Sequence, residues 1–352
     1  MTKILMKGAE AIGEAAIRAG CISYFCYPIT PQSEVAEYLS KRLPEVGGTF
    51  VQAESEVAAS QMVYGAAGAG IRVMTTSSSP GISLMTEGIS YIAGAKLPAV
   101  FVNIVRGGPG LGGILPSQAD YFQATKGGGH GDYRFLALAP ASVQEMVDLV
   151  IRAFPLSEKY RNPVMIVGDG LLAQMMEPVD FEAVENIPQI EVESWATTGC
   201  RERPANLVNS LFLDPLKLEQ FNWELKAKYE KMEEEISFEE YKMDDCEMFV
   251  VAYGTTSRVV RTAINTMRED GYKIGMFRPI SIFPFPQMAL RAHAENPRIK
   301  SLAVVEMSNG QMLEDVKWAT LEKKPVEFFA RNGGIVPNPQ ETMEFLIKSY
   351  EK

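Results

Sequence analysis

The chain contains few of the residues that build metal and iron–sulfur centres. Its 352 residues include four cysteines, none of them in a Cys-x-x-Cys pair, and two histidines, His130 and His293. Scattered thiols do not supply a self-contained iron–sulfur or zinc site, and they are typical of a protein in the reducing cytoplasm. Pairs of a nucleophile and a histidine are also poorly supplied. The sequence therefore predicts no metal ligands in this chain.

Long apolar runs and blocks of basic residues are scarce as well. The first twenty residues, MTKILMKGAEAIGEAAIRAG, carry Glu10 and Glu14 among their alanines, which is unlike a signal peptide or a membrane span. The formal net charge of −10 disfavours a nucleic-acid surface. We therefore expect a cytoplasmic protein with no nucleic-acid and no membrane partner. A small anion could still bind, because one well-placed arginine overrules net charge locally.

The remaining composition is that of a globular protein, with 46% hydrophobic and 22% charged residues. A chain of 352 residues exceeds a typical single core, so two domains are expected. Strand-like and helix-like stretches alternate from the strand Cys21–Cys26 through the continuous apolar run Pro98–Val105 to a last strand at Pro163–Val167. This alternation predicts an α/β fold with a doubly wound parallel sheet.

The alternation lapses in the middle of the chain and later resumes. The interval holds an irregular stretch, Asn186–Pro204, and a charged helix expected over Leu216–Glu240, which we interpret as a solvated connector. We therefore predict a domain at residues 1–180, a linker with a charged helix at residues 181–245, and a smaller α/β domain at residues 246–352.

The stretch Val51–Gly70, VQAESEVAASQMVYGAAGAG, predicts a helix whose body consists of small and apolar residues. It opens with two acids, Glu54 and Glu56. Small side chains let a flat ligand or another backbone approach closely, and a carboxylate sheltered there is suited to holding or passing a proton. The alternative is that both acids only complement the positive end of the helix dipole.

Three turns follow predicted strands, at the level where open α/β sheets bind ligands. YPITPQSE, residues 27–34, is stiffened by Pro28 and Pro31, and SSSPG occupies residues 77–81. Arg106 ends the third strand and precedes the loop GGPGLGGILP, where a guanidinium could grip a carboxylate or phosphate. Each feature also has an ordinary explanation: a turn can be only a turn, and an arginine can lie solvated at the surface. The loop does not match a P-loop.

Taken in order, the motifs YPITPQSE, AESEVAA, SSSPG and VRGGPG closely resemble those of the alpha subunit of 2-oxoacid:ferredoxin oxidoreductases. The similarity is nearest to the branched-chain, 2-oxoisovalerate-type members. In the second half, FRPISIFPFP and VVEMSNGQ resemble the family's transketolase C-terminal-like α/β domain. The resemblance covers nearly the whole chain apart from the linker, and it implies that the first domain is a thiamine diphosphate pyrimidine-binding domain.

The resemblance implies an enzyme that uses thiamine diphosphate and is active only with its partner subunits. Glu56 matches the family's cofactor-activating glutamate, and Arg106 matches the arginine that reads the 2-oxoacid carboxylate. Pro28, Ile29 and Thr30 match the turn that lines the cofactor and the substrate. The implied catalytic set is thus Glu56, Arg106 and Thr30, and no residue of this set binds a metal.

The resemblance also implies a division of labour among subunits. A beta subunit would hold the diphosphate and Mg²⁺, and the only Gly-Asp-Gly of this chain, residues 168–170, lacks the downstream Asn-Asn of that motif and is interpreted as a turn. Iron–sulfur clusters, coenzyme A and ferredoxin chemistry would belong to a gamma subunit and a ferredoxin-like iron–sulfur subunit. The implied reaction is oxidative decarboxylation of a 2-oxoacid to acyl-CoA, with electrons passed to ferredoxin (EC 1.2.7 class).

The loop after Arg106 bears on the substrate. It contains no Ser or Thr before Ser117, whereas family members with polar substrates place a hydroxyl there. An apolar loop favours an aliphatic tail, hence a branched-chain 2-oxoacid over 2-oxoglutarate or pyruvate. Two other interpretations are a non-catalytic scaffold subunit and a single-chain thiamine enzyme, the latter disfavoured by the missing diphosphate motif.

Overall fold

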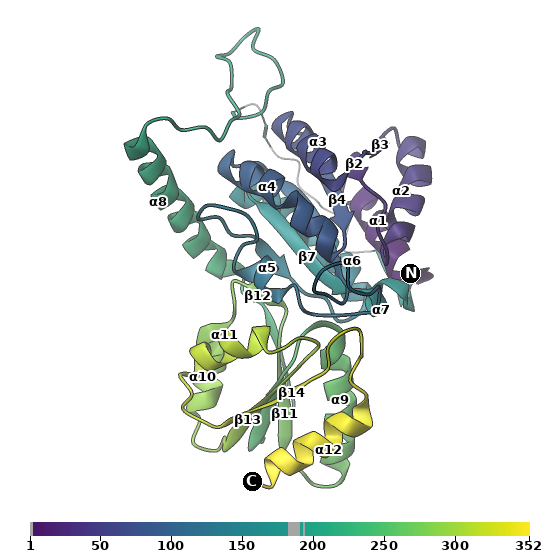
Figure 1. Ribbon diagram of the computed structural model, residues 1–352, viewed down its shortest axis with the longest axis vertical. Helices are drawn as coiled ribbons and strands as arrows, with labels where there is room; N and C mark the ends of the chain where they lie inside the picture. The colour runs from purple at the N-terminus through teal and green to yellow at the C-terminus, as the bar shows by residue number, and fades with distance from the viewer. Residues whose placement is uncertain (1–2, 182–190, 193) are drawn as a thin grey trace.

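The structure, a computed structural model, describes residues 3–181, 191–192 and 194–352. Figure 1 shows two lobes stacked along the long axis of the molecule. The N-terminal lobe is built on a seven-stranded sheet, and the C-terminal lobe on a five-stranded sheet. The irregular stretch expected over Asn186–Pro204 lies partly outside the described residues.

The seven-stranded sheet has the order β12-β6-β7-β5-β4-β2-β3. Its strands are β2 (Ser23–Cys26), β3 (Thr49–Gln52), β4 (Val73–Ser77), β5 (Ala99–Val105), β6 (Leu136–Leu138), β7 (Pro163–Asp169) and β12 (Ser281–Phe283). All neighbours pair in parallel except β12, which runs antiparallel to β6. The predicted doubly wound α/β fold is confirmed.

Alternate residues of the buried strands face two different helix layers. Val100, Val102 and Ile104 of β5 belong to one apolar cluster, whereas Phe101 and Val105 belong to another. The first cluster receives the helices α1 (Gly8–Arg18), α2 (Ser33–Glu45) and α6 (Val143–Tyr160), and the second receives α3 (Glu56–Gly68) and α4 (Ser79–Gly94). A continuous apolar run is what a strand covered on both faces requires.

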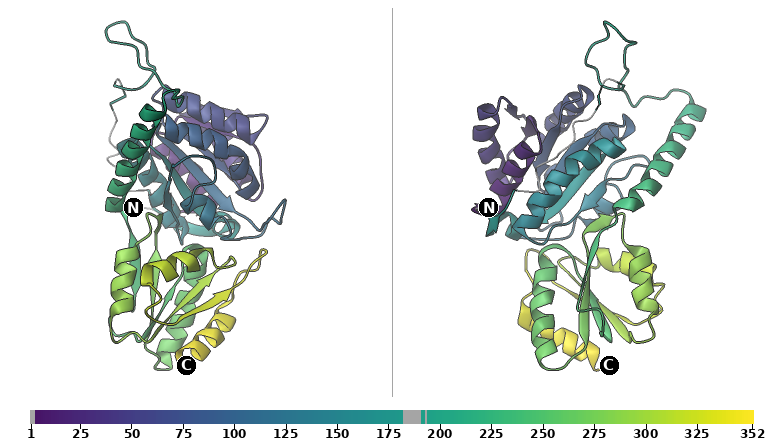
Figure 2. Two further views of the ribbon diagram at one scale, coloured as in Figure 1. Left: turned by 60° about the vertical axis from the view of Figure 1, so that its left-hand side comes forward. Right: turned by 180° about the vertical axis from the view of Figure 1, so that it is seen from behind.

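The C-terminal lobe repeats this arrangement on a smaller scale (Figure 2). Its sheet has the order β14-β13-β10-β11-β9, with only β9 antiparallel to its neighbour. The strands are β9 (Phe238–Tyr241), β10 (Met248–Val251), β11 (Ile274–Pro279), β13 (Ser301–Glu306) and β14 (Val326–Ala330). The helices pack in two pairs, α9 (Gly254–Glu269) with α12 (Pro339–Tyr350), and α10 (Gln287–Glu295) with α11 (Gln311–Thr320).

Several predicted elements are wrong in extent or in partner. Pro163–Val167 is not the last strand that the chain contributes to this sheet, because β12 of the C-terminal half pairs with β6. The predicted helix Val51–Gly70 begins at Glu56, since Thr49–Gln52 is extended and pairs with β2. Local composition does not reveal these changes, which depend on strand pairing between distant segments.

The middle of the chain differs from prediction too. The charged helix α8 spans Pro215–Lys231 and ends well before Glu240, because Phe238–Tyr241 forms strand β9 at the edge of the second sheet. A short antiparallel pair, β1 (Ile4–Lys7) with β8 (Met176–Val179), was not predicted. The proposed domain limits at 180/181 and 245/246 therefore stay a prediction. Strand β9 comes from the predicted linker but belongs to the five-stranded sheet, and β12 comes from the predicted second domain but belongs to the seven-stranded sheet.

The two lobes share an apolar core. One cluster contains Phe101 and Tyr121 from the N-terminal half together with Tyr253, Phe277 and Leu290 from the C-terminal half. Along the described part of the chain, every helix is too short or too polar to cross a bilayer.

Candidate functional site

The three predicted ligand turns meet at one edge of the first sheet. β2, β4 and β5 are sheet neighbours, and the carboxyl ends of parallel strands share an edge. The turns after them are residues 27–34, 77–81 and 106–116. The second is shorter than predicted, because α4 already begins at Ser79.

The Arg106 side chain lies inside the protein, with 6% of the residue exposed. Its Nη1 donates to the carbonyl oxygen of Thr30 at 2.9 Å, and its Nη2 donates to that of Leu111 at 3.1 Å. Its buried Nε has no hydrogen-bond partner. Among the described residues no carboxylate pairs with this guanidinium, so a nearly buried positive charge is held by neutral acceptors alone. The structure thus brings Arg106 and Thr30 together, as predicted.

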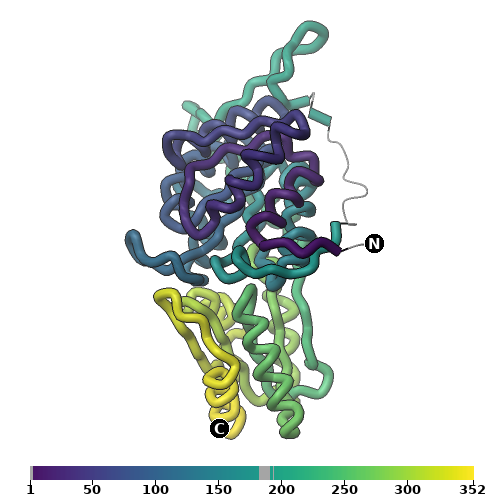
Figure 3. Tube along the Cα trace, turned by 90° about the vertical axis from the view of Figure 1, so that its right-hand side faces the viewer, coloured from purple at the N-terminus to yellow at the C-terminus, as the bar shows by residue number. Residues whose placement is uncertain are grey.

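The loop that follows Arg106 projects from the junction of the lobes, above a loop of the C-terminal lobe (Figure 3). Its base is closed by a bridge between Arg106 and Pro116. Gly107 lies against Gly333, so closely that an added Cβ would sit 3.3 Å from the Gly333 carbonyl carbon. The C-terminal lobe therefore supports one side of this loop.

Glu56 is the first residue of α3 and is 6% exposed. Ser55 caps the helix by accepting a hydrogen bond from the amide of Ala58 at 3.2 Å. The Glu56 carboxyl reaches the first turn of α4, where a Cβ on Gly81 would come within 2.8 Å of its Oε1. No hydrogen bond or ion pair of this side chain is found in the described parts of the chain. A side chain at position 81 would meet both the Ser77 hydroxyl and the Glu56 carboxyl, so the glycine leaves room for these two groups.

A network that was not predicted joins α4 to Arg106. The Asp120 Oδ2 accepts from the Ser79 hydroxyl at 2.7 Å and from the Asn103 amide at 2.8 Å. The Ser79 Oγ in turn accepts from the Arg106 amide at 3.0 Å. Burial raises the pKa of Asp120, and the two donors act in the opposite direction. The only sequence signal for this network was Asn103, the one polar residue in the run PAVFVNIV.

Unpartnered polar atoms gather at the same edge. The buried hydroxyls of Thr75, Ser77 and Ser78, at the end of β4, have no hydrogen-bond partner, and neither has the side-chain nitrogen of Gln32. Buried polar groups are normally satisfied, so such a concentration marks a place where partners come from outside the chain.

Family comparisons agree with this geometry. Residues 14–245 match the model "Pyruvate flavodoxin/ferredoxin oxidoreductase, thiamine diP-bdg", and residues 246–342 match "Pyruvate:ferredoxin oxidoreductase core domain II". The chain is 53% identical over 337 residues to the ketoisovalerate oxidoreductase subunit VorB of Methanothermobacter marburgensis, which covers 95% of this chain and 94% of that one. The chain belongs to the 2-oxoacid:ferredoxin oxidoreductases, as an alpha-type subunit.

Other members of the 2-oxoacid:ferredoxin oxidoreductase family are more distant. The 2-oxoglutarate synthase subunit KorA of Methanothermobacter thermautotrophicus is 36% identical over 370 residues, covering 97% of this chain and 98% of that one. The 2-oxoglutarate:ferredoxin oxidoreductase of Magnetococcus marinus, solved with 2-oxoglutarate, coenzyme A and succinyl-CoA bound, superimposes with a TM-score of 0.87 at 27% identity. It covers all of this chain, which spans 66% of that longer chain. A split-gene transketolase shares the fold, with a TM-score of 0.60 at 12% identity, 98% of each chain being covered.

The family's thiamine diphosphate-binding domain, matched over residues 14–245, therefore covers most of the N-terminal lobe, in a subunit of a multi-subunit oxidoreductase. Asp169, in the only Gly-Asp-Gly, accepts hydrogen bonds from the amides of Leu171 and Leu172 at 2.9 and 3.1 Å. It caps α7 (Gly170–Gln174), which follows β7 directly, so the predicted turn is a strand-to-helix junction with no separate turn residue. Within the described residues, no group of three His, Cys, Asp or Glu side chains is arranged to hold a metal ion.

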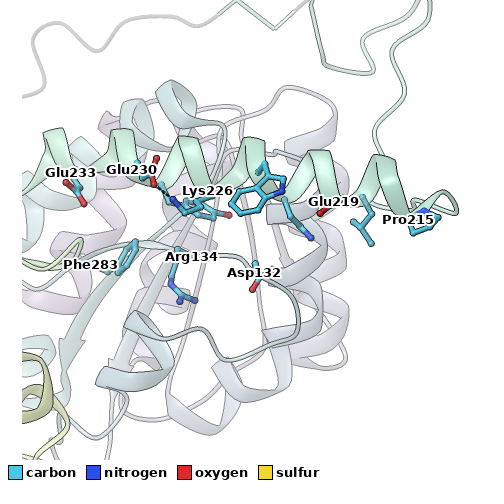
Figure 4. Close-up of a pocket in the computed structure, with 12 residues that line it drawn as sticks. Asp132, Arg134, Pro215, Glu219, Lys226, Glu230, Glu233 and Phe283 are labelled. Atoms are coloured by element: carbon cyan, nitrogen blue, oxygen red, sulfur yellow. Dashed lines mark hydrogen bonds and ion pairs between the residues drawn. The ribbon is translucent and has the colours of Figure 1, made fainter. Parts of the chain in front are cut away.

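A groove of about 790 Å³ lies apart from the predicted site residues (Figure 4). It runs between α8 and a segment containing Asp132 and Arg134, with Phe283 at one end and Trp223 on the helix. None of Pro28, Ile29, Thr30, Glu56 and Arg106 lines it.

Proposed function

We propose that this chain is the alpha-type subunit of a complex that oxidises a branched-chain 2-oxoacid to its acyl-CoA and passes the electrons to ferredoxin. Glu56, Arg106 and Thr30 act on cofactor and substrate, and Pro28, Ile29 and Thr30 line the cofactor. A beta subunit grips the diphosphate and Mg²⁺. A gamma subunit and a ferredoxin-like iron–sulfur subunit complete the complex, and coenzyme A and the clusters lie outside this chain.

The observation that carries the proposal is the buried Arg106 charge without a counter-ion among the described residues. Neutral carbonyl groups do not neutralise the positive charge of a buried guanidinium. A carboxylate that accepts two parallel hydrogen bonds is the ligand that best matches its planar set of donors. Arg106 bonds to the carbonyl oxygen of Thr30, and Thr30 lies in the turn that is assigned to the cofactor. The substrate carboxylate and the cofactor ring would therefore be held side by side.

The other buried groups at this edge suit the ring end of thiamine diphosphate. Glu56 offers a sheltered carboxyl without an internal partner, and the unpartnered hydroxyl of Ser77 lies against the same Gly81. When bound, the cofactor supplies an electron sink for the decarboxylation. Glu56 would hold a proton at its carboxyl oxygen toward the ring nitrogen, and the residue is sheltered from water because it is only 6% exposed.

The Arg106 loop supports an aliphatic substrate. Leu111, Ile114 and Leu115 are 84%, 58% and 56% exposed, and no residue from Gly107 to Pro116 is charged. A second carboxylate, as in 2-oxoglutarate, would require a further donor set that this loop does not offer. The relatives named as ketoisovalerate oxidoreductase subunits favour the same substrate class.

The test is a substrate panel on the purified complex. With coenzyme A and a viologen acceptor, kcat/KM should be highest for 2-oxoisovalerate, above pyruvate and 2-oxoglutarate. Arg106→Ala should raise the 2-oxoacid KM roughly 10- to 100-fold, since a charge-assisted hydrogen bond is worth about 1.5–3 kcal/mol. A preference for 2-oxoglutarate would contradict the substrate class, and an unchanged KM would make Arg106 structural.

A further inference from the structure

The segment Ser117–Phe122, which follows the Arg106 loop, is bonded to both lobes; we call it the bridging segment. On the C-terminal side, the Gln118 amide donates to the Met307 carbonyl at 2.9 Å. The Gln118 side chain is buried and crosses the same boundary: its Nε2 donates to the Tyr253 carbonyl at 2.9 Å. Its Oε1 accepts from the Thr256 hydroxyl and the Met307 amide, both at 2.8 Å. One residue thus ties the segment to the ends of β10 and β13.

The rest of the bridging segment repeats this connection. The Tyr121 hydroxyl donates to Asp315 Oδ2 at 2.7 Å. The side chain of Gln311 donates to the Ala119 carbonyl at 2.7 Å and accepts from the Phe122 amide at 2.8 Å. Since α11 carries both Gln311 and Asp315, this helix holds the segment at three points.

In contrast, the Asp120 side chain bonds to the N-terminal lobe. Through Ser79 and Asn103 it fixes the first turn of α4 and the backbone of Arg106. The bridge from Arg106 to Pro116 joins the arginine to the start of the bridging segment. Residues on both sides of Asp120 therefore bond to the C-terminal lobe while Asp120 bonds to the N-terminal lobe, and Arg106 lies at the end of the chain of contacts.

We propose that the C-terminal lobe positions Arg106 for the substrate carboxylate through the bridging segment, with Gln118 as the positioning residue. The inference rests on the proposed role of Arg106. A guanidinium grips a carboxylate bidentately only in a narrow geometry, so a shift of the Arg106 backbone weakens substrate binding before it affects later steps. The transketolase-like lobe would then contribute to substrate binding without contacting the substrate.

The experiment compares variants in the assembled complex. Gln118→Leu removes the side-chain bonds of Gln118 to the second lobe, and Tyr121→Phe removes one bond while Asp315 keeps its ion pair with Lys126. Arg258→Gln is the matched control, because Arg258 joins the lobes through Glu177 and the Ala141 carbonyl, away from the bridging segment. For each we measure Tm, kcat and the 2-oxoacid KM, beside Arg106→Ala.

We expect Gln118→Leu to raise KM about tenfold, a modest part of the ~10²-fold that a misplacement of one ångström can cost. Tyr121→Phe should raise KM about threefold, with kcat within about twofold for both variants, and Arg258→Gln should lower Tm without changing KM. If Gln118→Leu does not assemble, Tyr121→Phe decides. Lowered Tm with unchanged KM in the bridging variants, while Arg106→Ala raises KM, would overturn this inference alone. An unchanged KM in Arg106→Ala would overturn the role of Arg106, and this inference with it.

Discussion

Glu54 and Glu56 are separated by one residue but occupy different surroundings. Glu54 is exposed in the turn before α3, whereas Glu56 is buried at the first position of the helix, against Gly81 of α4. Ser55 between them caps α3. The cap directs the two acids to opposite environments, so only Glu56 has the shelter that proton transfer requires.

This difference provides a matched pair of variants. Glu56→Gln keeps the size of the side chain but removes the proton that it holds, so turnover of the complex should fall at least ~10²-fold, the lower end of what general acid–base groups contribute. Glu54→Gln should leave turnover within about twofold. Tm and cofactor-free assembly serve as folding controls. Near-normal turnover of Glu56→Gln would favour a scaffold subunit instead.

Among the helices of the first lobe, α8 is the most exposed to solvent. Leu225 is its one buried residue. The predicted solvated connector nevertheless carries a partly buried lysine. Lys228 donates to the Arg161 carbonyl at 3.3 Å, and burial, followed by the charges of Lys96 and Arg161, lowers the pKa of its ammonium to about 7. The helix therefore packs a cation where a neutral amine is preferred.

The pH dependence of stability follows from that pKa. In the unfolded chain a lysine titrates near 10.4, so between pH 7 and about 10 the unfolded state binds a proton that the folded state has released. The contribution of Lys228 to stability therefore increases with pH across this window. Relative to Lys228→Met, the wild type should gain at least about 1 kcal/mol, or roughly 2–4 °C in Tm, from pH 7 to pH 10. Parallel Tm curves for the two proteins would show that Lys228 titrates normally.

At the scale of the whole molecule, ion pairs at the junction supplement the shared apolar core. Arg278 of β11 donates from Nη1 and Nη2 to the two carboxylate oxygens of Glu145 in α6, both at 2.8 Å. Its Nε donates to Glu239 of β9 at 2.7 Å. The Arg278 side chain is 8% exposed, so this cluster is largely removed from water. It clamps the second sheet to the first lobe.

Removing this arginine should be costly. Arg278→Ala leaves Glu145 without its ion pair, while Glu239 keeps Arg261 as a partner, and should destabilise the chain by about 1–3 kcal/mol. Lys323→Ala, which breaks the exposed pair with Glu295, is the control and should cost about 1 kcal/mol or less. Chemical denaturation of both variants measures the contrast. Equal midpoints would mean that the Arg278 cluster adds little to the stability of the lobe junction.

The elements that could be predicted are those with a strong local signal. The apolar runs predicted the strands β2, β5 and β7 of the first sheet. The strand β12 was not predicted, because its three residues pair with β6 more than 140 positions away. Strand β9 was not predicted either, because its residues FEEY continue the charged pattern of α8. Short length concealed β12, and charge concealed β9.

The amino-acid sequence by itself determined the fold class, the family, the turns that contain Thr30 and Arg106, and the helix that contains Glu56, because these depend on short patterns read in order. Tertiary structure alone decided that Arg106 bonds to the Thr30 carbonyl, that Asp120 faces Ser79, and that Gln118 reaches Tyr253. Those contacts join residues 41 to 135 positions apart. They form only when separate strands and lobes pack, and no local pattern encodes that packing.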